Sequence, residues 1–292
     1  MNKLMYSAPL YFIAFLPAVM ILYQLCPQKF RKYVLLLANY AFFYTWSKFF
    51  LVYQVITMVI TYVSSKIIDH TANKKIKKIS LIIAILINLG VLVVLKYTNF
   101  FGENIFAIFH QPFTPIRLIA PIGISYYTLQ MISYLMDTSS GKIHSNHSIL
   151  DFAVYASFFP TLIQGPITRF NEIKEDIHAG NPITYQNLKF GSQRILFGLM
   201  KKMIIADRLD PAVSKIFTSY TQDGLFSLIG AVLCTIQLYM DFSGIVDICL
   251  GSAEIFGIKL PENFRQPFFA ENASDFWRRW HITLGTFLRD YV

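Results

Sequence analysis

The chain alternates apolar runs with short polar segments that carry most of its lysines. The runs approach the length needed to cross a bilayer, about 20 residues, which favours membrane helices over the alternating strands of a barrel. We expect an all-α, polytopic membrane protein with about seven to nine membrane helices, some broken or re-entrant, in a single membrane-embedded domain, 1–292. The predicted spans are Pro9–Leu25, Tyr33–Trp46, Phe49–Ile68, Ile79–Tyr97, Ile119–Met136, Leu150–Ile163 and Leu225–Phe256.

Two of these spans carry helix-breaking residues. Pro121–Gly123 lies inside the fifth span, and Gln164 begins a Gln-Gly-Pro sequence directly after the sixth. A broken membrane helix is tolerated only where protein or a water-filled cavity satisfies the freed backbone groups. We therefore expect both breaks to face the protein interior. The aromatic, proline-containing segment Phe100–Leu118 is predicted to be an outer loop or a helix lying in the interface.

Charge and composition support a membrane location. Only 15% of the residues are charged, 54% are hydrophobic, and the formal net charge is +9. The lysines cluster in short loops between spans, as the positive-inside rule describes, so these loops are predicted to be cytoplasmic and the N-terminus outside. This pattern argues against nucleic-acid binding. The first run ends without a cleavage site, which predicts a retained span, and Cys26, Cys234 and Cys249 have neither disulfide nor metal-ligand spacing.

Acidic residues interrupt the last apolar span. Asp241, Asp247 and Glu254 lie at positions where a charge is costly, so by default they mark a cavity or a functional path. An alternative for Asp241 is that it caps a helix restarting at Ser243. Asp247 and Glu254 are seven residues apart on one face, and we expect them to pair with arginines of the segment 263–290.

The segment from Asn263 to Asp290 concentrates four arginines, two tryptophans and one histidine. Phe276, Trp280 and Thr283 are spaced as one helical face with His281 at its edge. Histidine suits general acid and base chemistry near neutral pH, whereas a Trp/Arg-rich helix beside a membrane is more often an interfacial anchor. The other paired histidines, His144 and His147, sit in a polar loop and are predicted to be solvated rather than metal-bound; no metal site is expected.

Several blocks of the sequence resemble the membrane-bound O-acyltransferase family, in its bacterial branch of alginate O-acetyltransferases and D-alanyl-lipoteichoic acid transferases. The final block is the most specific, and the blocks follow the family's order along nearly the whole chain. They are Pro121–Tyr127, Phe159–Ile167, Gly198–Lys202, Tyr239–Gly244, Asn263–Pro267 and Phe276–Leu284.

The resemblance implies a ring of helices around a central channel and an acyl transfer. An acyl group, expected to be acetyl, would pass from a thioester such as acetyl-CoA or an acyl carrier protein to a hydroxyl of a cell-surface polysaccharide, without a cofactor. It implies the bacterial inner membrane, contact with membrane lipid, and an extracytoplasmic esterase-like partner. His281 is the candidate catalytic residue, and the candidate channel or substrate-binding residues are Gln164, Asp241, Ser243, Asn263, Arg265, Trp277, Arg278 and Arg279.

The chain departs from the family at its end. The family's catalytic histidine lies in a later apolar span, and no histidine here matches it; His281 corresponds to the family's second histidine. We therefore expect a C-terminally truncated form, the N-terminal two-thirds of the fold, with impaired activity. The alternatives are a transporter or channel subunit, supported by broken spans and intramembrane acids, and a catalytically inactive scaffold.

Overall fold

The computed structural model describes residues 5–46, 48–116, 123–219 and 223–292. Within these ranges the protein is helical apart from turns and one isolated β-bridge. The first half forms η1 (Tyr11–Phe15), α1 (Leu16–Leu25), η2 (Gln28–Phe30), α2 (Arg31–Trp46), α3 (Lys48–His70), α4 (Lys74–Ile108), α5 (Ile124–Ser139), α6 (Ile149–Ser157) and α7 (Phe170–Ala179). The second half forms α8 (Tyr185–Leu199), η3 (Met200–Ala206), α9 (Asp207–Ser219), α10 (Gly224–Ile255), η4 (Pro267–Phe269), α11 (Ala273–Arg279) and α12 (Ile282–Tyr291).

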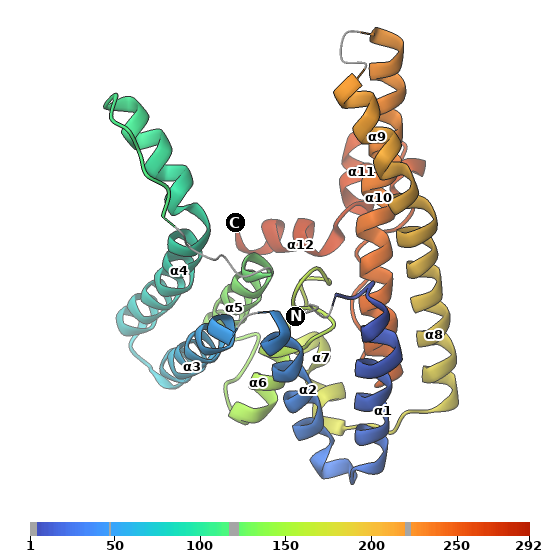
Figure 1. Cartoon of the computed structure of the whole chain (residues 1–292). Coiled ribbons are helices and arrows are strands. Elements are labelled where there is room, and N and C mark those ends of the chain that lie inside the picture. The colour runs from blue at the N-terminus through green and yellow to red at the C-terminus, as the bar shows by residue number, and fades with distance from the viewer. Residues whose placement is uncertain (1–4, 47, 117–122, 220–222) are drawn as a thin grey trace.

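The helices form two arms with a shorter element between them. Figure 1 shows α4 on one side, the α8–α9–α10 hairpin on the other, and α12 lying across the space between. The largest core cluster packs beneath them. It is rich in aromatic rings, among them Tyr11, Phe42 and Phe159, which are all fully buried. Tyr11 also donates a hydrogen bond to Ser252 of α10 at 2.9 Å, which joins the N-terminal helices to that arm.

Three helices among the described residues are long and apolar enough to cross a membrane. They cover Leu51–His70, Lys74–Ile108 and Gly224–Ile255, and the apolar helix Tyr11–Leu25 is shorter. Side chains on the outer faces of the two arms are apolar and exposed, such as Leu86 at 61% and Leu228 at 64%. Surfaces of this kind suit contact with lipid rather than water. The protein is therefore an all-helical membrane protein.

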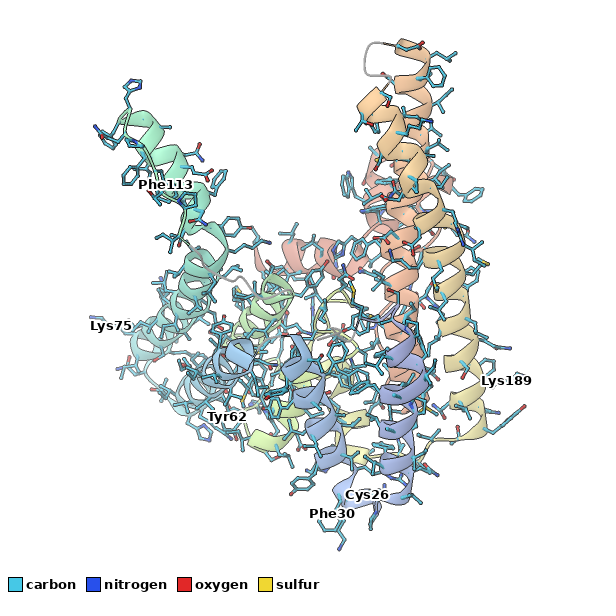
Figure 2. The ribbon with its side chains drawn as sticks, viewed as in Figure 1. Cys26, Phe30, Tyr62, Lys75, Phe113 and Lys189 are labelled. Carbon is cyan, nitrogen blue, oxygen red and sulfur yellow. The ribbon has the colours of Figure 1, made fainter. Side chains whose placement is uncertain are left out.

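The segment Phe100–Leu118 differs from its prediction. Its first part continues α4 without a break to Ile108, because no proline occurs before residue 112 and Gly102 alone does not interrupt the helix. The following residues fold back along the helix, and Asn99 exchanges two hydrogen bonds of 2.9 Å with the backbone of Ile116. Phe113, labelled in Figure 2, packs where Gly102 leaves room for its ring. Residues 117 and 118 lie outside the described part.

The two predicted backbone breaks lie against each other. Pro121 and Ile122 are outside the described residues, but Gly123 is in the left-handed region with φ +86° and begins α5. A Cβ added at Gly123 would stand 2.5 Å from the carbonyl oxygen of Leu162. The helix expected over Leu150–Ile163 ends at Ser157, earlier than predicted, and turns follow it up to the Gln164 region. Backbone of the segment after α6 therefore packs directly against the break at Gly123.

Two pairs of glycines bring α8 and α10 into backbone contact. An added Cβ at Gly191 would lie 2.6 Å from the carbonyl oxygen of Gly251, and one at Gly198 would lie 2.5 Å from that of Gly244. Each glycine of α10 meets its partner on α8 in the same way, at 2.5 and 2.9 Å. Small residues allow this approach, which drives helix association in a membrane through van der Waals contact.

Ion pairs reinforce the same contact and correct one prediction. Asp247 of α10 is 5% exposed and bonds Arg194 and Lys201, each at 2.6 Å. Arg194 also pairs with Glu262 at 2.7 Å. The expected pairing of Asp247 and Glu254 with arginines of the segment 263–290 is therefore wrong, because α8 and η3 are the elements packed against this face of α10. A buried carboxylate requires such partners.

We predict that Gly198→Ala destabilises the fold by ~1–3 kcal/mol, since its Cβ would meet backbone that can move only if the helices separate. The matched control is Gly90→Ala in α4, where an added Cβ has nothing within 4 Å. This control is expected to be neutral or slightly stabilising, because alanine is the better helix former. Thermal unfolding in lipid nanodiscs measures both variants, and equal midpoints would contradict the proposed contact.

Candidate functional site

Within the Asn263–Asp290 segment, the residues just before α11 pair with the residues just after it. Phe264 and Trp280 form the isolated antiparallel bridge, the amide of Arg265 donates to the carbonyl of Arg279 at 2.9 Å, and that of Ile282 donates to the carbonyl of Asn263 at 3.0 Å. The two ends of the segment are therefore held side by side. This pairing fixes where the residue between Trp280 and Ile282 lies.

That residue, His281, interrupts the helix predicted to run through it. α11 ends at Arg279, and His281 adopts φ +47° before α12 begins at Ile282. Phe276 and Trp280 still stack, with ring centroids 5.6 Å apart, but Thr283 belongs to the next helix. The single helical face predicted for Phe276, Trp280 and Thr283 is therefore wrong. Positive φ is uncommon outside glycine, and persists only where surrounding contacts hold it.

Asn263 supplies those contacts. Its side chain is fully buried, and Oδ1 lies 3.2 Å from Nδ1 of His281 while accepting from the amide and the hydroxyl of Thr283 at 3.1 and 3.0 Å. The Thr283 hydroxyl in turn accepts from the amide of Ile167 at 3.1 Å. One asparagine thus connects the histidine, the start of α12 and the segment that follows the Gln164 break.

The imidazole of His281 is set up as a neutral base. An amide oxygen only accepts, so Nδ1 carries the ring proton and Nε2 keeps its lone pair. The ring stacks on Tyr126 at 6.3 Å and meets the edge of Phe242 at 5.0 Å. Burial among these groups lowers the pKa of His281 to about 4, because the charged form is poorly solvated there.

A cavity of about 530 Å³ lies next to the two rings that pack on this histidine. Tyr126 and Phe242 form part of its wall, whereas His281 is not among its lining residues. The cavity is bounded by α4, the start of α5, the segment before Gln164 and α10, and its lining residues are Lys96, Gly123, Ile124, Ser125, Tyr126, Ile163, Gln164, Leu238, Asp241 and Phe242. Pockets of this size accept small-molecule ligands.

Asp241 lines this cavity and does not cap a helix. α10 runs unbroken from Gly224 to Ile255, so the alternative of a helix restarting at Ser243 is wrong. The Asp241 carboxylate pairs with Lys202 at 2.6 Å, and Lys202 also pairs with Asp207 at 2.6 Å. The lysine thereby compensates the charge of the aspartate while leaving it 40% exposed toward the cavity.

The remaining candidates divide into those near the cavity and those away from it. Gln164 lines it, whereas Ser243 lies in the wall of a smaller cavity of about 180 Å³ between α8 and α10. Trp277 is 64% exposed and Arg279 pairs with Asp275 at 2.8 Å. Besides Ser243, five candidates are not among the lining residues of this cavity: Asn263, which bonds His281, and Arg265, Trp277, Arg278 and Arg279.

Sequence reasoning missed several residues of this site. Tyr126 and Phe242 lie inside the blocks that carried the family resemblance, but only their packing on His281 gives them a role. Thr283 was assigned to a helical face rather than to the hydrogen bond with Asn263. Lys96 had a usable signal, because a charged residue at the end of an apolar span is itself unusual.

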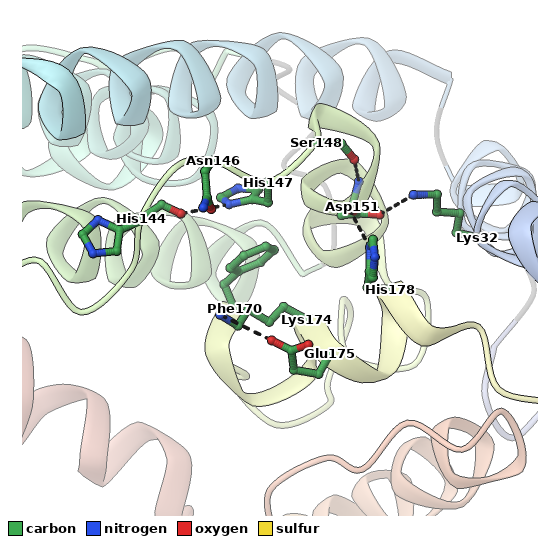
Figure 3. A pocket seen from close by; sticks show the side chains of 10 residues that line it. All are labelled: Lys32, His144, Asn146, His147, Ser148, Asp151, Phe170, Lys174, Glu175 and His178. Carbon is green, nitrogen blue, oxygen red and sulfur yellow. Dashed lines mark hydrogen bonds and ion pairs between the residues drawn. The ribbon is translucent and has the colours of Figure 1, made fainter.

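A second cavity, of about 360 Å³, lies at the loop between α5 and α6. Figure 3 shows Lys32 and His178 both directed at Asp151, which they meet at 2.9 and 3.3 Å. His144 is exposed, as predicted, whereas His147 is only partly exposed, because its ring lies 4.3 Å from that of Phe170. Burial lowers the pKa of His147. Across the described residues, no group of three or more His, Cys, Asp or Glu side chains could hold a metal ion.

Comparison with known proteins identifies the family. The model of the MBOAT, membrane-bound O-acyltransferase, family matches residues 76–292. The chain is 34% identical over 296 residues to the probable alginate O-acetylase AlgI of Pseudomonas aeruginosa, covering 99% of this chain and 56% of that protein. It is also 34% identical over 328 residues to the peptidoglycan O-acetyltransferase of Helicobacter pylori, covering 99% of this chain and 61% of that protein.

A more distant match extends the same group. The teichoic acid D-alanyltransferase of Bacillus subtilis is 32% identical over 186 residues, covering 63% of this chain and 47% of that protein. The chain thus spans 56% to 61% of the two O-acetyltransferases it matches along its length. The family expected from the sequence blocks is confirmed, and the chain belongs to the membrane-bound O-acyltransferase family.

Proposed function

We propose that this protein transfers an acyl group, taken to be acetyl, from a thioester donor to a hydroxyl of a cell-surface polysaccharide. Family membership supports acyl transfer. The observation that carries the proposal is the imidazole of His281, whose Nδ1 is fixed by Asn263 and whose ring packs on two residues of the cavity wall. A polysaccharide acceptor is supported by likeness to two relatives named as acetylating alginate and peptidoglycan.

The proposed chemistry needs a base and a confined space. The acceptor hydroxyl oxygen forms a bond to the thioester carbonyl carbon as its proton passes to Nε2 of His281. The carbon–sulfur bond then breaks, and the imidazolium returns that proton to the leaving thiolate. Holding both substrates in one cavity replaces an encounter in solution by a positioned reaction. Asp241 and Gln164, on the cavity wall, are proposed to bind the acceptor, and no resident cofactor is required.

The proposed setting is a bacterial inner membrane, with about seven to nine helices of a single domain around a channel. The basic loops support one orientation. Lys32 bonds Asp151 and Lys66 bonds the backbone of Ser145, so both loops lie at the face of the α5–α6 connection. By the positive-inside rule this face is cytoplasmic and the N-terminus outside. The donor, acetyl-CoA or an acyl carrier protein, approaches from this face; the glycan and an esterase-like partner meet the other.

We predict that His281→Ala lowers acyl transfer by roughly 10²–10⁴-fold, the usual contribution of a positioned general base. The assay follows labelled acetyl from acetyl-CoA into polysaccharide in membranes carrying the protein. The matched control is His70→Ala, since His70 is exposed at the end of α3 and away from the cavity. Full transfer by His281→Ala would contradict the proposed role. Movement of labelled substrate across the membrane without any transfer would favour the transporter alternative.

The pH dependence tests the electrostatic setting of His281. A base whose pKa is about 4 stays neutral above about pH 5, so its contribution is lost only as the pH falls through 4. Asn263→Asp keeps the acceptor oxygen and adds a negative charge, which stabilises the imidazolium and raises the pKa of His281. We predict that the acid limb of the rate profile moves upward by about one pH unit or more in this variant. An unshifted limb would show that His281 is not the titrating base.

A further inference from the structure

Lys96 places a positive charge on the wall of the cavity beside His281. It belongs to α4, within the candidate span Lys74–Ile108, and it is a lining residue of the cavity. Its Nζ donates to the hydroxyl of Ser125 at 3.1 Å, across the gap between α4 and α5. A charged side chain on an apolar helix is costly, and by default it marks a functional path.

No acid of the chain neutralises this lysine. All aspartates and glutamates lie in the described residues, and none of them forms an ion pair with Lys96. The contrast is with Lys201 and Lys202, each of which meets a carboxylate of α10 at 2.6 Å. A lysine retained only to stabilise the helix packing would be expected to have a partner of this kind. Besides the Ser125 hydroxyl, the Nζ of Lys96 meets the ring of Tyr97, 5.6 Å from its centroid, and neither group is an anion. The charge of Lys96 is therefore available to an anionic ligand.

The α10 wall of the cavity carries a carboxylate. Asp241 of α10 faces the same space from the other arm, and it is already held by Lys202. The cavity thus has an unpaired cation at α4 and, at α10, a carboxylate whose charge Lys202 compensates but which can still accept a hydrogen bond. The Tyr126 and Phe242 rings that pack on His281 are also in its wall. A ligand that fits both sides carries an anion at one end and a hydroxyl donor at the other.

We propose that Lys96 binds the carboxylate of an acidic sugar in the acceptor glycan, an inference that rests on the proposed acyl transfer. A single sugar unit with a carboxylate and a ring hydroxyl carries both the anion that Lys96 would bind and the hydroxyl that would donate to Asp241. With the carboxylate at Lys96, its hydroxyl turns toward Asp241, which accepts the hydrogen bond, and toward the His281 side of the cavity. The volume of about 530 Å³ accommodates a ligand of this size. Lys96 is thus a positioning and specificity residue for acidic glycans.

The test compares a charged probe with its neutral form. The protein in lipid nanodiscs is titrated with an oligouronate and with the same oligomer fully methyl-esterified, and the dissociation constants are measured at low and at physiological salt. We expect the unaltered protein to prefer the oligouronate, Lys96→Gln to lose about tenfold in its affinity, and Lys96→Arg to retain most of it. The control is Lys75→Gln, on the same helix but directed away from the protein in Figure 2.

Three results would overturn the inference. These are equal affinity for both oligomers, unchanged preference in Lys96→Gln, and loss in Lys75→Gln as large as in Lys96→Gln. A parallel titration with coenzyme A decides whether the lysine serves a phosphate instead. If Lys96→Gln weakens the binding of coenzyme A but not that of the oligouronate, Lys96 binds the acyl donor rather than the glycan, and the proposal is overturned. If the protein binds oligouronate in a Lys96-dependent way but transfers no acyl group, the proposed reaction is contradicted and the proposed role of Lys96 in binding is not.

Discussion

The backbone contact between α8 and α10 is the constraint on which the rest of the structure depends. Lipid offers apolar side chains the same environment as a helix surface, so two membrane helices gain little from burying leucine and gain more from close approach. The glycine pairs provide that approach, and the Asp247 ion pairs add a polar contact beside it. Asp241 and Phe242 then owe their place at the cavity to the register in which α10 is held.

The histidine depends on a second, local constraint. His281 is held at φ +47° by two sets of contacts. The segments before and after α11 pair with each other, and the side chain of Asn263 bonds both His281 and Thr283. The backbone strain and the orientation of the imidazole share one cause. Because Thr283 also accepts from Ile167, the same hydrogen bonds reach the broken segment after α6. The site is thus assembled from three parts of the sequence that lie far apart.

Hydropathy and glycine positions predicted the helical membrane class and the break at Gly123, because both depend on residues acting locally. The length of α4 was not predictable from its aromatics, since Phe100 and its neighbours are compatible with either a helix or an interfacial loop. The break at His281 has no local marker, because its positive φ is imposed by Asn263 eighteen residues away. The partner of Asp247 also escaped prediction: arginines were available in two segments, and only the packing of α8 selects Arg194.

The π-helical stretch η3 between α8 and α9 has one more consequence. Adjacent lysines there reach two different acids of α10, Lys201 to Asp247 and Lys202 to Asp241, because neighbouring residues of a helix point in different directions. In an α-helix each residue turns the chain by about 100°. Losing a single residue from this wide turn would therefore rotate the whole of α9 about its axis. The number of residues in η3, as well as their side chains, therefore sets which side of α9 meets the bilayer.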